Sequence, residues 1–585
     1  MNPTHSPNKS PISKVFSSVR SGFLGGAGIS LVINILMLTG PLFMLQVYDR
    51  VLASGSVPTL VAIGGLAVVL YGFYGILEGI RGRILLRLGL QVDAMLSEET
   101  YRWSNSLPVR LGRKGAALSP IRDLDTIRQF LAGAGPAAFF DLPWLPLYLG
   151  IVFLFHPLLG FVGLGGAVVI FVLILLNEVM SRAPVAESNR EAASRSANVE
   201  IGQRNSEAIA AMGMQPALSS NWTARNADYL ATLLRSADRS GLFGTIIKTV
   251  RFVLQSAVLG VGAWLAIQQE ITPGVMIAAS IMTSRALAPI EQAVAQWRGF
   301  VCFRQALKRL REGLAIAQKD DEQKLDLPLP EKQLDLEAVF CGPYGEATPF
   351  VQGITLSLDA GDGLGIIGPS GSGKSTLARA LVGALAPLKG HVRFDGAEIG
   401  QWDDDRRGAF VGYLPQDLQL FDGSIADNIA RFRQDVEADT VIEAAKRADV
   451  HDLIVSLPDG YNTLIGRGGR NLSAGQRQRI ALARALYGNP FLIVLDEPNS
   501  NLDSVGEAAL TNSIKVMRDL GSIVIVIAHR PSAIATVNKI LCLKDGKQTA
   551  FGPKDEVLKQ VLTPAQTPPQ GPVQVPIPDI QGGVA

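Results

Sequence analysis

The sequence predicts a two-part chain, in which a helical transmembrane domain of six spans with long helical arms precedes a soluble α/β domain that carries a P-loop. Hydrophobic residues make up 48% of the 585 positions and charged residues 18%, a balance typical of membrane proteins. Uncharged runs in the first half exceed the ~20 residues that cross a bilayer. In the second half, a glycine-rich phosphate-binding pattern follows an apolar strand.

Charge and cysteine content exclude several other classes of protein. The 54 Lys and Arg residues nearly balance the 52 Asp and Glu residues, so the chain lacks the strongly basic surface of a nucleic-acid binder. Cys302, Cys341 and Cys542 lie far apart in the sequence. Their spacing indicates neither a disulfide framework nor a zinc site.

Six membrane spans are expected from the apolar runs. They cover residues 22–48, 51–77, 136–155, 158–177, 245–268 and 274–297. The first run is too long for the apolar part of a signal peptide, so we expect it to remain in the mature protein. The last two spans carry Lys248, Arg251 and Arg285. Snorkelling towards the membrane surface explains the first two of these charges.

The basic residues predict the orientation of the spans. They are concentrated in the N-terminal tail and in the connections 81–135 and 178–245, whereas Arg50 is the only Lys or Arg in the three short turns. The positive-inside rule therefore places the N-terminus and both long connections in the cytoplasm. We expect the connections to form helical arms that reach about 30–35 Å below the membrane.

These patterns divide the chain into five segments. A cytoplasmic tail (1–22) is expected to precede the transmembrane domain (23–310), a charged linker (311–332), the soluble α/β domain (333–560) and a disordered Pro-rich tail (561–585).

Residues 368–375, Gly-Pro-Ser-Gly-Ser-Gly-Lys-Ser, form a complete P-loop pattern after an apolar strand. Glycines allow the backbone to fold around phosphate oxygens, Lys374 supplies a positive charge to them, and Ser375 offers a hydroxyl to Mg²⁺. A chance glycine turn would not show the whole pattern. The candidate phosphate-binding residues are Gly368, Ser370, Gly371, Ser372, Gly373, Lys374, Ser375 and Thr376.

A second candidate element is the apolar run 491–495, which ends in Asp496 and Glu497. This order of the two acids is the one expected if Asp496 holds Mg²⁺ through water and Glu497 polarises the attacking water. Two acids after a strand are common in any protein. Their position about 120 residues after the P-loop favours the functional interpretation.

Residues 472–479, Leu-Ser-Ala-Gly-Gln-Arg-Gln-Arg, resemble the signature sequence of the ABC transporter superfamily. By the same resemblance, Gln416 matches the Q-loop, which contacts nucleotide and metal, Asp503 matches the D-loop and His529 matches the switch histidine. The signature residues implied to contact nucleotide are Ser473, Ala474, Gly475 and Gln476.

The resemblance implies that two ATPase domains pair head to tail, with each ATP between one P-loop and the other subunit's signature. Because this chain has one such domain, a homodimer with two composite sites is expected. ATP and Mg²⁺ are the implied cofactors, and Lys374, Glu497 and His529 are the implied catalytic residues.

The membrane half is similar to the type I protein-secretion ABC transporters, in the branch that exports proteases, lipases and heme-binding proteins. The similarity rests on residues 41–52, 140–144 and 155–157, and on residues 497–503 of the ATPase domain. It implies an exporter of unfolded polypeptides with a C-terminal signal in the bacterial inner membrane, its ATPase domain in the cytoplasm. The implied partners are membrane lipid, a periplasmic membrane fusion protein and an outer-membrane tunnel protein.

Two alternative functions stay open at this point. The first is an ABC exporter of lipid or small amphiphilic molecules. The second is a non-catalytic membrane scaffold or sensor that uses ATP only as a ligand. The intact set Lys374, Asp496, Glu497 and His529 argues against the second.

Several positions depart from the family pattern or allow two interpretations. Ala474 replaces the usual glycine, and a helix-start conformation would tolerate its Cβ. Arg467 stands where many exporters have an acidic residue. The adenine-stacking residue is Tyr344, unless Pro343 occupies the aligned position. Arg285 either faces an aqueous pathway or forms an ion pair, with Asp141 as one partner.

Overall fold

The computed structural model describes residues 11–116, 118–321, 324–342, 348–466, 471–528 and 534–562. It divides into two compact units, Met1–Asp320 and Asp321–Ala585. Most of the segment predicted to be a Pro-rich tail, from residue 563 onward, lies outside the described residues. The combination of apolar helices and a sheet-containing domain confirms the predicted fold class.

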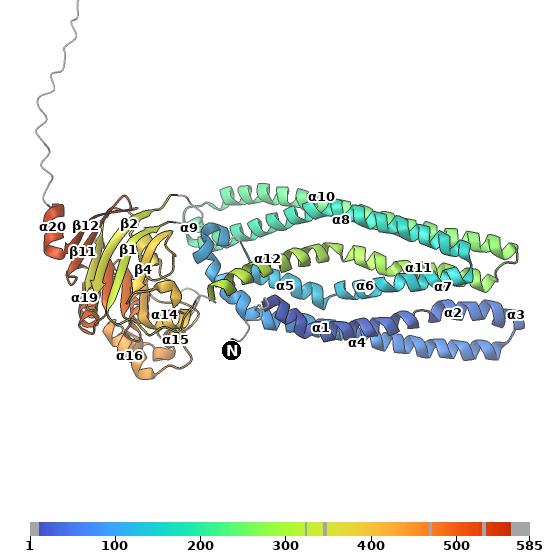
Figure 1. Cartoon of the computed structure of the whole chain (residues 1–585), viewed down its shortest axis with the longest axis horizontal. Helices are drawn as coiled ribbons and strands as arrows, with labels where there is room; N and C mark the ends of the chain where they lie inside the picture. Colours follow the sequence, from blue (N-terminus) through green and yellow to red (C-terminus); the bar gives the residue numbers. More distant parts are fainter. Residues whose placement is uncertain are drawn as a thin grey trace, which may run out of the picture. The chain divides into compact units, whose positions relative to one another are not determined.

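The described residues of the first unit form helices joined by short turns, and six of the helical segments are long and apolar enough to cross a membrane (Figure 1). The prediction of six spans is therefore confirmed. The helices are α1 (Pro11–Leu36), α2 (Thr39–Gln46), η1 (Val47–Val51), α3 (Leu52–Ser54), α4 (Val57–Ala116), α5 (Pro120–Ala132), α6 (Gly135–Asp141), η2 (Leu142–Trp144), α7 (Leu145–Phe155), α8 (Pro157–Arg204), α9 (Ser206–Ala211), α10 (Gln215–Ile267), α11 (Pro273–Ala295) and α12 (Trp297–Asp321).

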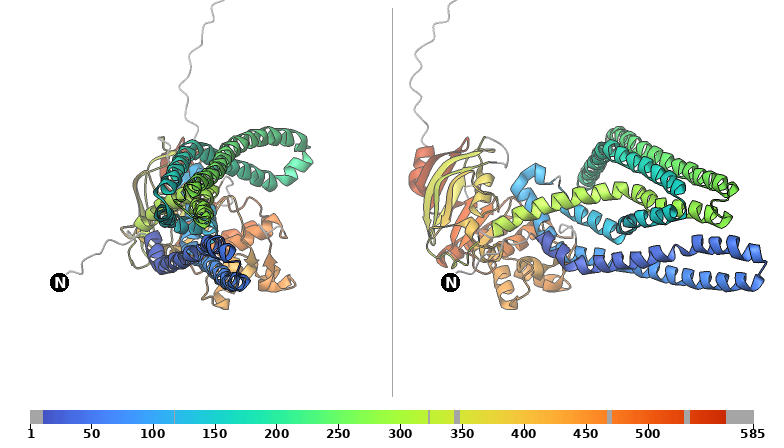
Figure 2. Two further views of the ribbon diagram at one scale, coloured as in Figure 1. Left: turned by 90° about the vertical axis from the view of Figure 1, so that its right-hand side faces the viewer. Right: turned by 45° about the vertical axis from the view of Figure 1, so that its right-hand side comes forward.

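Three of these helices continue far beyond their membrane spans. Helices α8 and α10 contain 48 and 53 residues, which correspond to lengths of about 70–80 Å, whereas the 60 residues of α4 are interrupted by non-helical backbone at Gly112 (φ 54°). Helices α1 and α4 lie side by side, as do α8 and α10 (Figures 1 and 2). The predicted connections are therefore helical extensions of the spans themselves.

The first span is not one straight helix. A turn at residues 37 and 38 separates α1 from α2, and the short π-helix η1 follows α2 directly. Asp49, in η1, accepts hydrogen bonds from the Thr272 hydroxyl (2.6 Å) and the Gly274 backbone N–H (3.0 Å). Because both donors lie at the start of α11, Asp49 caps that helix and connects the first span to the sixth.

A buried polar network joins α1, α4 and α6 inside the span region. The Arg81 guanidinium donates to Asp141 (2.8 Å) and also to Glu78 (2.8 Å). Asn34 donates its side-chain amide to the same Asp141 oxygen at 2.8 Å. Asp141 therefore pairs with Arg81, and the suggestion that it pairs with Arg285 is wrong. Arg81 is closer in the fold because α4 packs against α1, which α6 also contacts.

The structure shows the neighbours of the two charges for which we predicted snorkelling, Lys248 and Arg251, in the fifth span. Arg251 forms an ion pair with Glu291 of α11 at 2.9 Å. The Lys248 ammonium lies 6.0 Å from the centre of the Phe252 ring. An ion pair between neighbouring helices lowers the cost of placing a cation in a membrane span.

The second unit begins after α12, which covers the first part of the segment predicted to be a linker. Its main sheet has ten strands in the order β5-β4-β1-β2-β12-β11-β3-β10-β9-β6. The strands are β1 (Gln333–Cys341), β2 (Val351–Asp359), β3 (Gly363–Ile367), β4 (Lys389–Phe394), β5 (Ala397–Glu398), β6 (Val411–Leu414), β9 (Leu492–Asp496), β10 (Ile523–Ile527), β11 (Lys539–Lys544) and β12 (Lys547–Pro553), with a separate pair β7 (Gly423–Ser424) and β8 (Leu464–Ile465).

Helices surround this sheet and its strand pair (Figure 1). They are α13 (Lys374–Leu381), η3 (Ile399–Gln401), α14 (Asp404–Phe410), α15 (Ile425–Ile429), α16 (Ala438–Arg447), α17 (His451–Ser456), η4 (Gly460–Asn462), α18 (Ala474–Leu486), α19 (Ser504–Asp519) and α20 (Lys554–Leu562). Strands β9 and β10 are buried along their whole length, and β10 reads Ile-Val-Ile-Val-Ile. Continuous β-branched runs of this kind are typical of central parallel strands covered on both faces.

Candidate nucleotide-binding site

The sheet order brings the predicted P-loop and the predicted acidic pair to one edge. Strands β3 and β9 both run parallel to β10, which lies between them. Parallel strands end at the same edge, so the loop after β3 and the carboxylates at the end of β9 are neighbours. Strand β6 is parallel to β9, and Gln416 follows it at the same edge as an exposed residue. The P-loop, the acidic pair and Gln416 therefore lie at the same edge of the sheet.

The P-loop depends on two glycines with left-handed backbone. Gly371 has a φ of 79° and Gly373 a φ of 91°. A Cβ at Gly373 would also lie 2.8 Å from the Val351 side chain, whereas one at Gly371 would meet nothing within 4 Å. The loop then enters α13 at Lys374. The free N–H groups at a helix start after such a loop favour a bound phosphate.

Lys374 is held against the loop that it follows. Its side-chain nitrogen donates to the carbonyl oxygens of Gly368 (2.9 Å) and Pro369 (2.8 Å). Burial lowers the pKa of Lys374, while the nearby Glu497 and Asp496 carboxylates act in the opposite direction. An ammonium group has three protons, so one remains for a phosphate oxygen.

Asp496 has the environment of a cation ligand. Burial raises the pKa of its carboxyl group, and a hydrogen bond from the Ser375 hydroxyl opposes this shift. The Oδ1 atom is buried and has no hydrogen-bond partner among the described residues. A buried carboxylate oxygen without a donor is costly unless a cation occupies the space beside it. Asp496 and Ser375 together therefore fit a hard divalent cation such as Mg²⁺.

Glu497 has an unusual backbone conformation. Its φ is 51°, in the left-handed region, and its N–H donates to the Ile527 carbonyl oxygen of β10 at 2.9 Å. For a residue with a Cβ, the left-handed backbone conformation costs about 1–2 kcal/mol relative to the right-handed one. Such strain persists where the surroundings fix a side chain in a functional direction.

The signature sequence forms the start of α18. Ser473 caps the helix by accepting from the Gln476 N–H (3.2 Å), and the Gln476 side chain accepts from the Ser473 N–H (2.8 Å). Ala474 is the first helical residue, so its Cβ is compatible with the backbone. A Cβ at Gly475 would approach the Asn501 carbonyl oxygen to 3.1 Å. The structure therefore favours glycine at 475 more than at 474.

Replacing Ala474 by Gly is expected to have a small effect. The helical backbone at 474 does not need glycine, so the turnover of ATP should change less than about twofold. Glycine should instead lower the melting temperature slightly, because it costs up to about 1 kcal/mol in a helix relative to alanine. ATPase assays and thermal melting of the purified protein measure both effects. A large gain in turnover would show that the Cβ crowds the site.

The structure also identifies two residues that we did not predict. Gln478 donates its side-chain amide to the Pro498 carbonyl oxygen and accepts from the Asn501 N–H (3.1 Å). Arg479 donates to Asp503 at 2.9 Å. These contacts connect the signature helix to the loop that follows Glu497. Both residues stand within the signature sequence, but only the fold shows that they face this loop.

Asp503 caps the start of α19, because its side chain accepts from the Gly506 N–H at 2.8 Å. That hydrogen bond lowers the pKa of Asp503, and Arg479 lowers it further.

Four residues discussed from the sequence, Tyr344, Pro343, Arg467 and His529, lie outside the described residues.

Comparison with known proteins agrees with this geometry. Residues 351–500 match the family described as "ABC transporter", and residues 24–287 match the family described as "ABC transporter transmembrane region". The chain is 47% identical over 547 residues to the "Type I secretion system ATP-binding protein PrsD" of Rhizobium meliloti, covering 94% of each protein. This chain belongs to the type I secretion ABC transporters.

A second relative of this ABC transporter is the "Cyclolysin secretion/processing ATP-binding protein CyaB" of Bordetella pertussis. It is 30% identical over 536 residues, which cover 91% of this chain and 75% of CyaB. A solved structure described as a bacterial Atm1-family ABC exporter with ATP bound has a TM-score of 0.79 and 24% identity, covering 93% of this chain and 97% of that one. That likeness confirms the fold. The ABC transporter is thus an ATP-binding ATPase with a multi-span membrane region.

Proposed function

We propose that this ABC transporter is the inner-membrane ATPase of a type I secretion system and drives the export of an unfolded polypeptide. The observation that carries this proposal is the 47% identity to PrsD, which extends over membrane region and ATPase domain alike. The name of CyaB also refers to secretion, in that case of cyclolysin. The Atm1-family exporter shares the fold, but at 24% identity it carries no argument about cargo.

The proposed active form is a homodimer with two composite ATP sites. In the described α/β unit, the P-loop begins after β3 and the signature residues begin α18. We infer that the α18 start of one subunit completes the site formed by Lys374 and Asp496 of the other. The Gln478 contacts then connect each subunit's signature to its own Glu497 loop.

The roles proposed within one site follow from the local chemistry. The P-loop N–H groups and Lys374 bind the phosphates of ATP. Ser375, Asp496 and Gln416 hold Mg²⁺, which neutralises charge on the phosphate oxygens when bound. Glu497 orients the attacking water, and His529 completes the contact to the γ-phosphate. Opening and closing of the dimer would move the long helical arms and so change which side of the membrane the pathway faces.

The proposed setting follows from the same relatives and from the charge distribution. We place the N-terminus and the ATPase domain in the cytoplasm, because the long connections carry most of the basic residues. The proposed partners are a periplasmic membrane fusion protein, an outer-membrane tunnel protein and a secreted polypeptide with a C-terminal signal.

A cargo-stimulated ATPase assay tests the proposal. The purified full chain is reconstituted in proteoliposomes, and its turnover is measured with the C-terminal segment of a polypeptide that a type I secretion system exports. The control is the same segment in scrambled order. We expect stimulation by the native segment only. Stimulation by added lipid or a small amphiphile, with no response to the polypeptide, would favour the alternative cargo, and a monomer without turnover would refute the composite-site mechanism.

Arg285 is proposed to face the pathway of the cargo. It lies on α11 within the sixth span, is exposed, and forms no ion pair among the described residues. Because an exposed cation in a span favours an aqueous surface, we expect Arg285→Leu to reduce export several-fold without changing dimer assembly. Secretion in cells and size-exclusion chromatography of the purified protein measure the two effects. Unchanged export would remove Arg285 from the pathway.

A further inference from the structure

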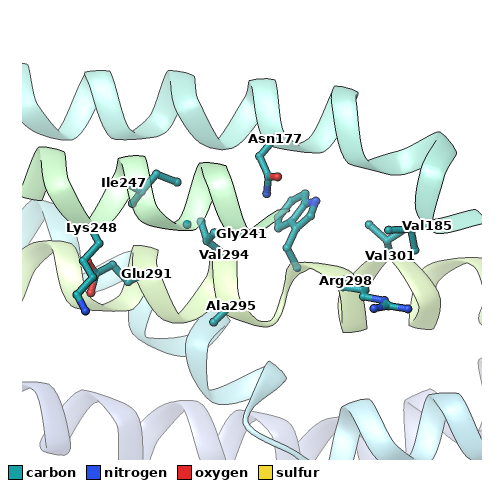
Figure 3. Close-up of a pocket in the computed structure, with 12 residues that line it drawn as sticks. Asn177, Val185, Gly241, Ile247, Lys248, Glu291, Val294, Ala295, Arg298 and Val301 are labelled. Atoms are coloured by element: carbon teal, nitrogen blue, oxygen red, sulfur yellow. The ribbon is translucent and has the colours of Figure 1, made fainter. Parts of the chain in front are cut away.

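A cavity of about 440 Å³ lies among α8, α10, α11 and α12 of the membrane unit (Figure 3). Its volume is within the range of ordinary small-molecule sites, which is roughly 300–1,000 Å³. The middle of the lining is apolar. The apolar contributors are Val185, Ile247, Val294, Ala295 and Val301, with the ring of Trp297.

The cavity lies where three membrane spans end. The fourth span ends at Met180, the fifth begins at Gly241 and the sixth ends at Ala295. Lining residues stand on both sides of this level, since Asn177 precedes Met180 and Arg298 follows Ala295. From α12 the chain continues into the α/β unit. The cavity therefore lies at the ends of these three spans, the level at which hydrocarbon gives way to water and lipid headgroups are found.

The lining carries more positive than negative charge. Its ionisable residues are Lys248, Arg298 and Glu291. Glu291 is already paired with Arg251, which lies outside the lining, at 2.9 Å. Within the described part of the chain neither Lys248 nor Arg298 forms an ion pair. Figure 3 shows Lys248 beside Glu291 at one end of the cavity and Arg298 at the other. Each end therefore has a cation available to an anion.

Two glycines leave the α10 wall of the cavity open. Gly241 and Gly244 both line it, and a Cβ added at either position would meet nothing within 4 Å. Neither glycine has a left-handed φ, so a larger residue would fit the helical backbone. The absence of side chains at these positions provides space for a ligand to enter between α8 and α10.

We propose that this cavity is a binding site for an anionic phospholipid. One of the two cations holds the phosphate, and the apolar middle with Trp297 receives the glycerol and the upper acyl chain. An anionic amphiphile fits better than a neutral one because it supplies the counter-charge that Lys248 and Arg298 lack. A bound lipid would contact four helices, among them α12, through which the chain enters the ATPase unit. The proposal concerns lipid recognition and does not depend on the identity of the cargo.

The experiment measures lipid binding to the full-length protein. Purified protein in detergent is titrated with phosphatidylglycerol and, separately, with phosphatidylcholine, and bound lipid is counted by native mass spectrometry. Inorganic phosphate is added as a competitor. We expect phosphatidylglycerol to bind at least tenfold more tightly than phosphatidylcholine. Competition by inorganic phosphate at low millimolar concentration would reduce the site to a phosphate site and overturn the lipid assignment.

Two matched pairs of variants locate the site. Gly244→Leu fills the cavity, whereas Gly260→Leu adds the same side chain elsewhere on α10, at another position where a Cβ meets nothing within 4 Å. Arg298→Gln removes a lining cation, whereas Arg311→Gln removes an exposed cation farther along α12. Lys248→Gln removes the other lining cation and is compared with the same control. A charge-assisted hydrogen bond to phosphate corresponds to about ten- to hundredfold in affinity.

The expected pattern is specific to the cavity. Gly244→Leu and at least one of Arg298→Gln and Lys248→Gln should weaken phosphatidylglycerol binding about tenfold or more, while the two control variants bind as the parent does. Which of the two cation variants has the effect shows which end holds the phosphate. Equal binding to the parent and to Gly244→Leu would overturn the proposal, and so would equal binding of the two lipids. Circular dichroism of each variant confirms that its helices are intact.

Discussion

Replacing Glu497 by Gln is expected to abolish most of the ATP turnover of this transporter while leaving ATP binding unchanged. The amide keeps the size of the side chain and removes the negative charge that polarises the attacking water. General-base contributions of this kind amount to about 10²–10⁴-fold in rate. Steady-state ATPase assays measure the loss, and nucleotide titration at low temperature measures binding. Turnover within tenfold of the parent would remove Glu497 from the catalytic role.

A second substitution at Glu497 separates its chemistry from its backbone strain. With a φ of 51°, this position suits glycine better than any residue with a Cβ. Glu497→Gly should lose turnover as Glu497→Gln does, because both lack the carboxylate. It should nevertheless melt at the same temperature as Glu497→Gln or higher, since relief of about 1–2 kcal/mol of strain exceeds the added entropy of the unfolded chain. A clear decrease in melting temperature would show that the backbone is not strained.

Removing Arg81 is expected to be the most destabilising single change in the membrane region. Arg81→Leu leaves the buried Asp141 carboxylate with only Asn34 as a donor among the contacts described above. Breaking one side of a buried ion pair costs about 3–5 kcal/mol, which is a large share of the stability of most folded proteins. Thermal melting of the detergent-purified protein, followed by size-exclusion chromatography, measures the effect.

Two controls make the interpretation of Arg81→Leu specific. Arg83→Leu removes an exposed arginine two residues away on the same helix and should leave the melting temperature nearly unchanged. Adding Asp141→Asn to Arg81→Leu removes the unpaired charge, so the double variant should be more stable than Arg81→Leu alone. If the double variant is equally unstable, packing of the Arg81 side chain rather than its charge stabilises this region.

Features that depend on local sequence could be predicted well. The P-loop glycines, the acids after a buried strand and the helix-start position of Ala474 each follow from the conformations that neighbouring residues allow. The six spans follow from the length of uncharged runs, because only a helix satisfies its own backbone within lipid. The meeting of the P-loop and Asp496 follows from the rule that parallel strands end at one edge of a sheet.

Features that depend on contacts between distant segments could not be predicted. Asp141 has Arg81 as its partner because α1, α4 and α6 pack together, whereas the sequence offered Arg285 equally well. The roles of Gln478 and Asp49 depend on which face of a helix meets a distant loop. The left-handed backbone of Glu497 could not be predicted from the sequence either, because glutamate is not among the residue types that favour it, which are glycine, asparagine and aspartate.

The π-helix at Val47–Val51 makes this segment sensitive to chain length rather than to residue type. One extra residue per turn is what distinguishes it from the flanking α-helical backbone. Deleting a single residue there would rotate Asp49 by about 100° relative to the preceding helix, away from Thr272 and Gly274. Homologous proteins could therefore vary the neighbouring apolar side chains freely. A homologue with more or fewer residues in this turn than the present chain would need a different residue to cap the last span.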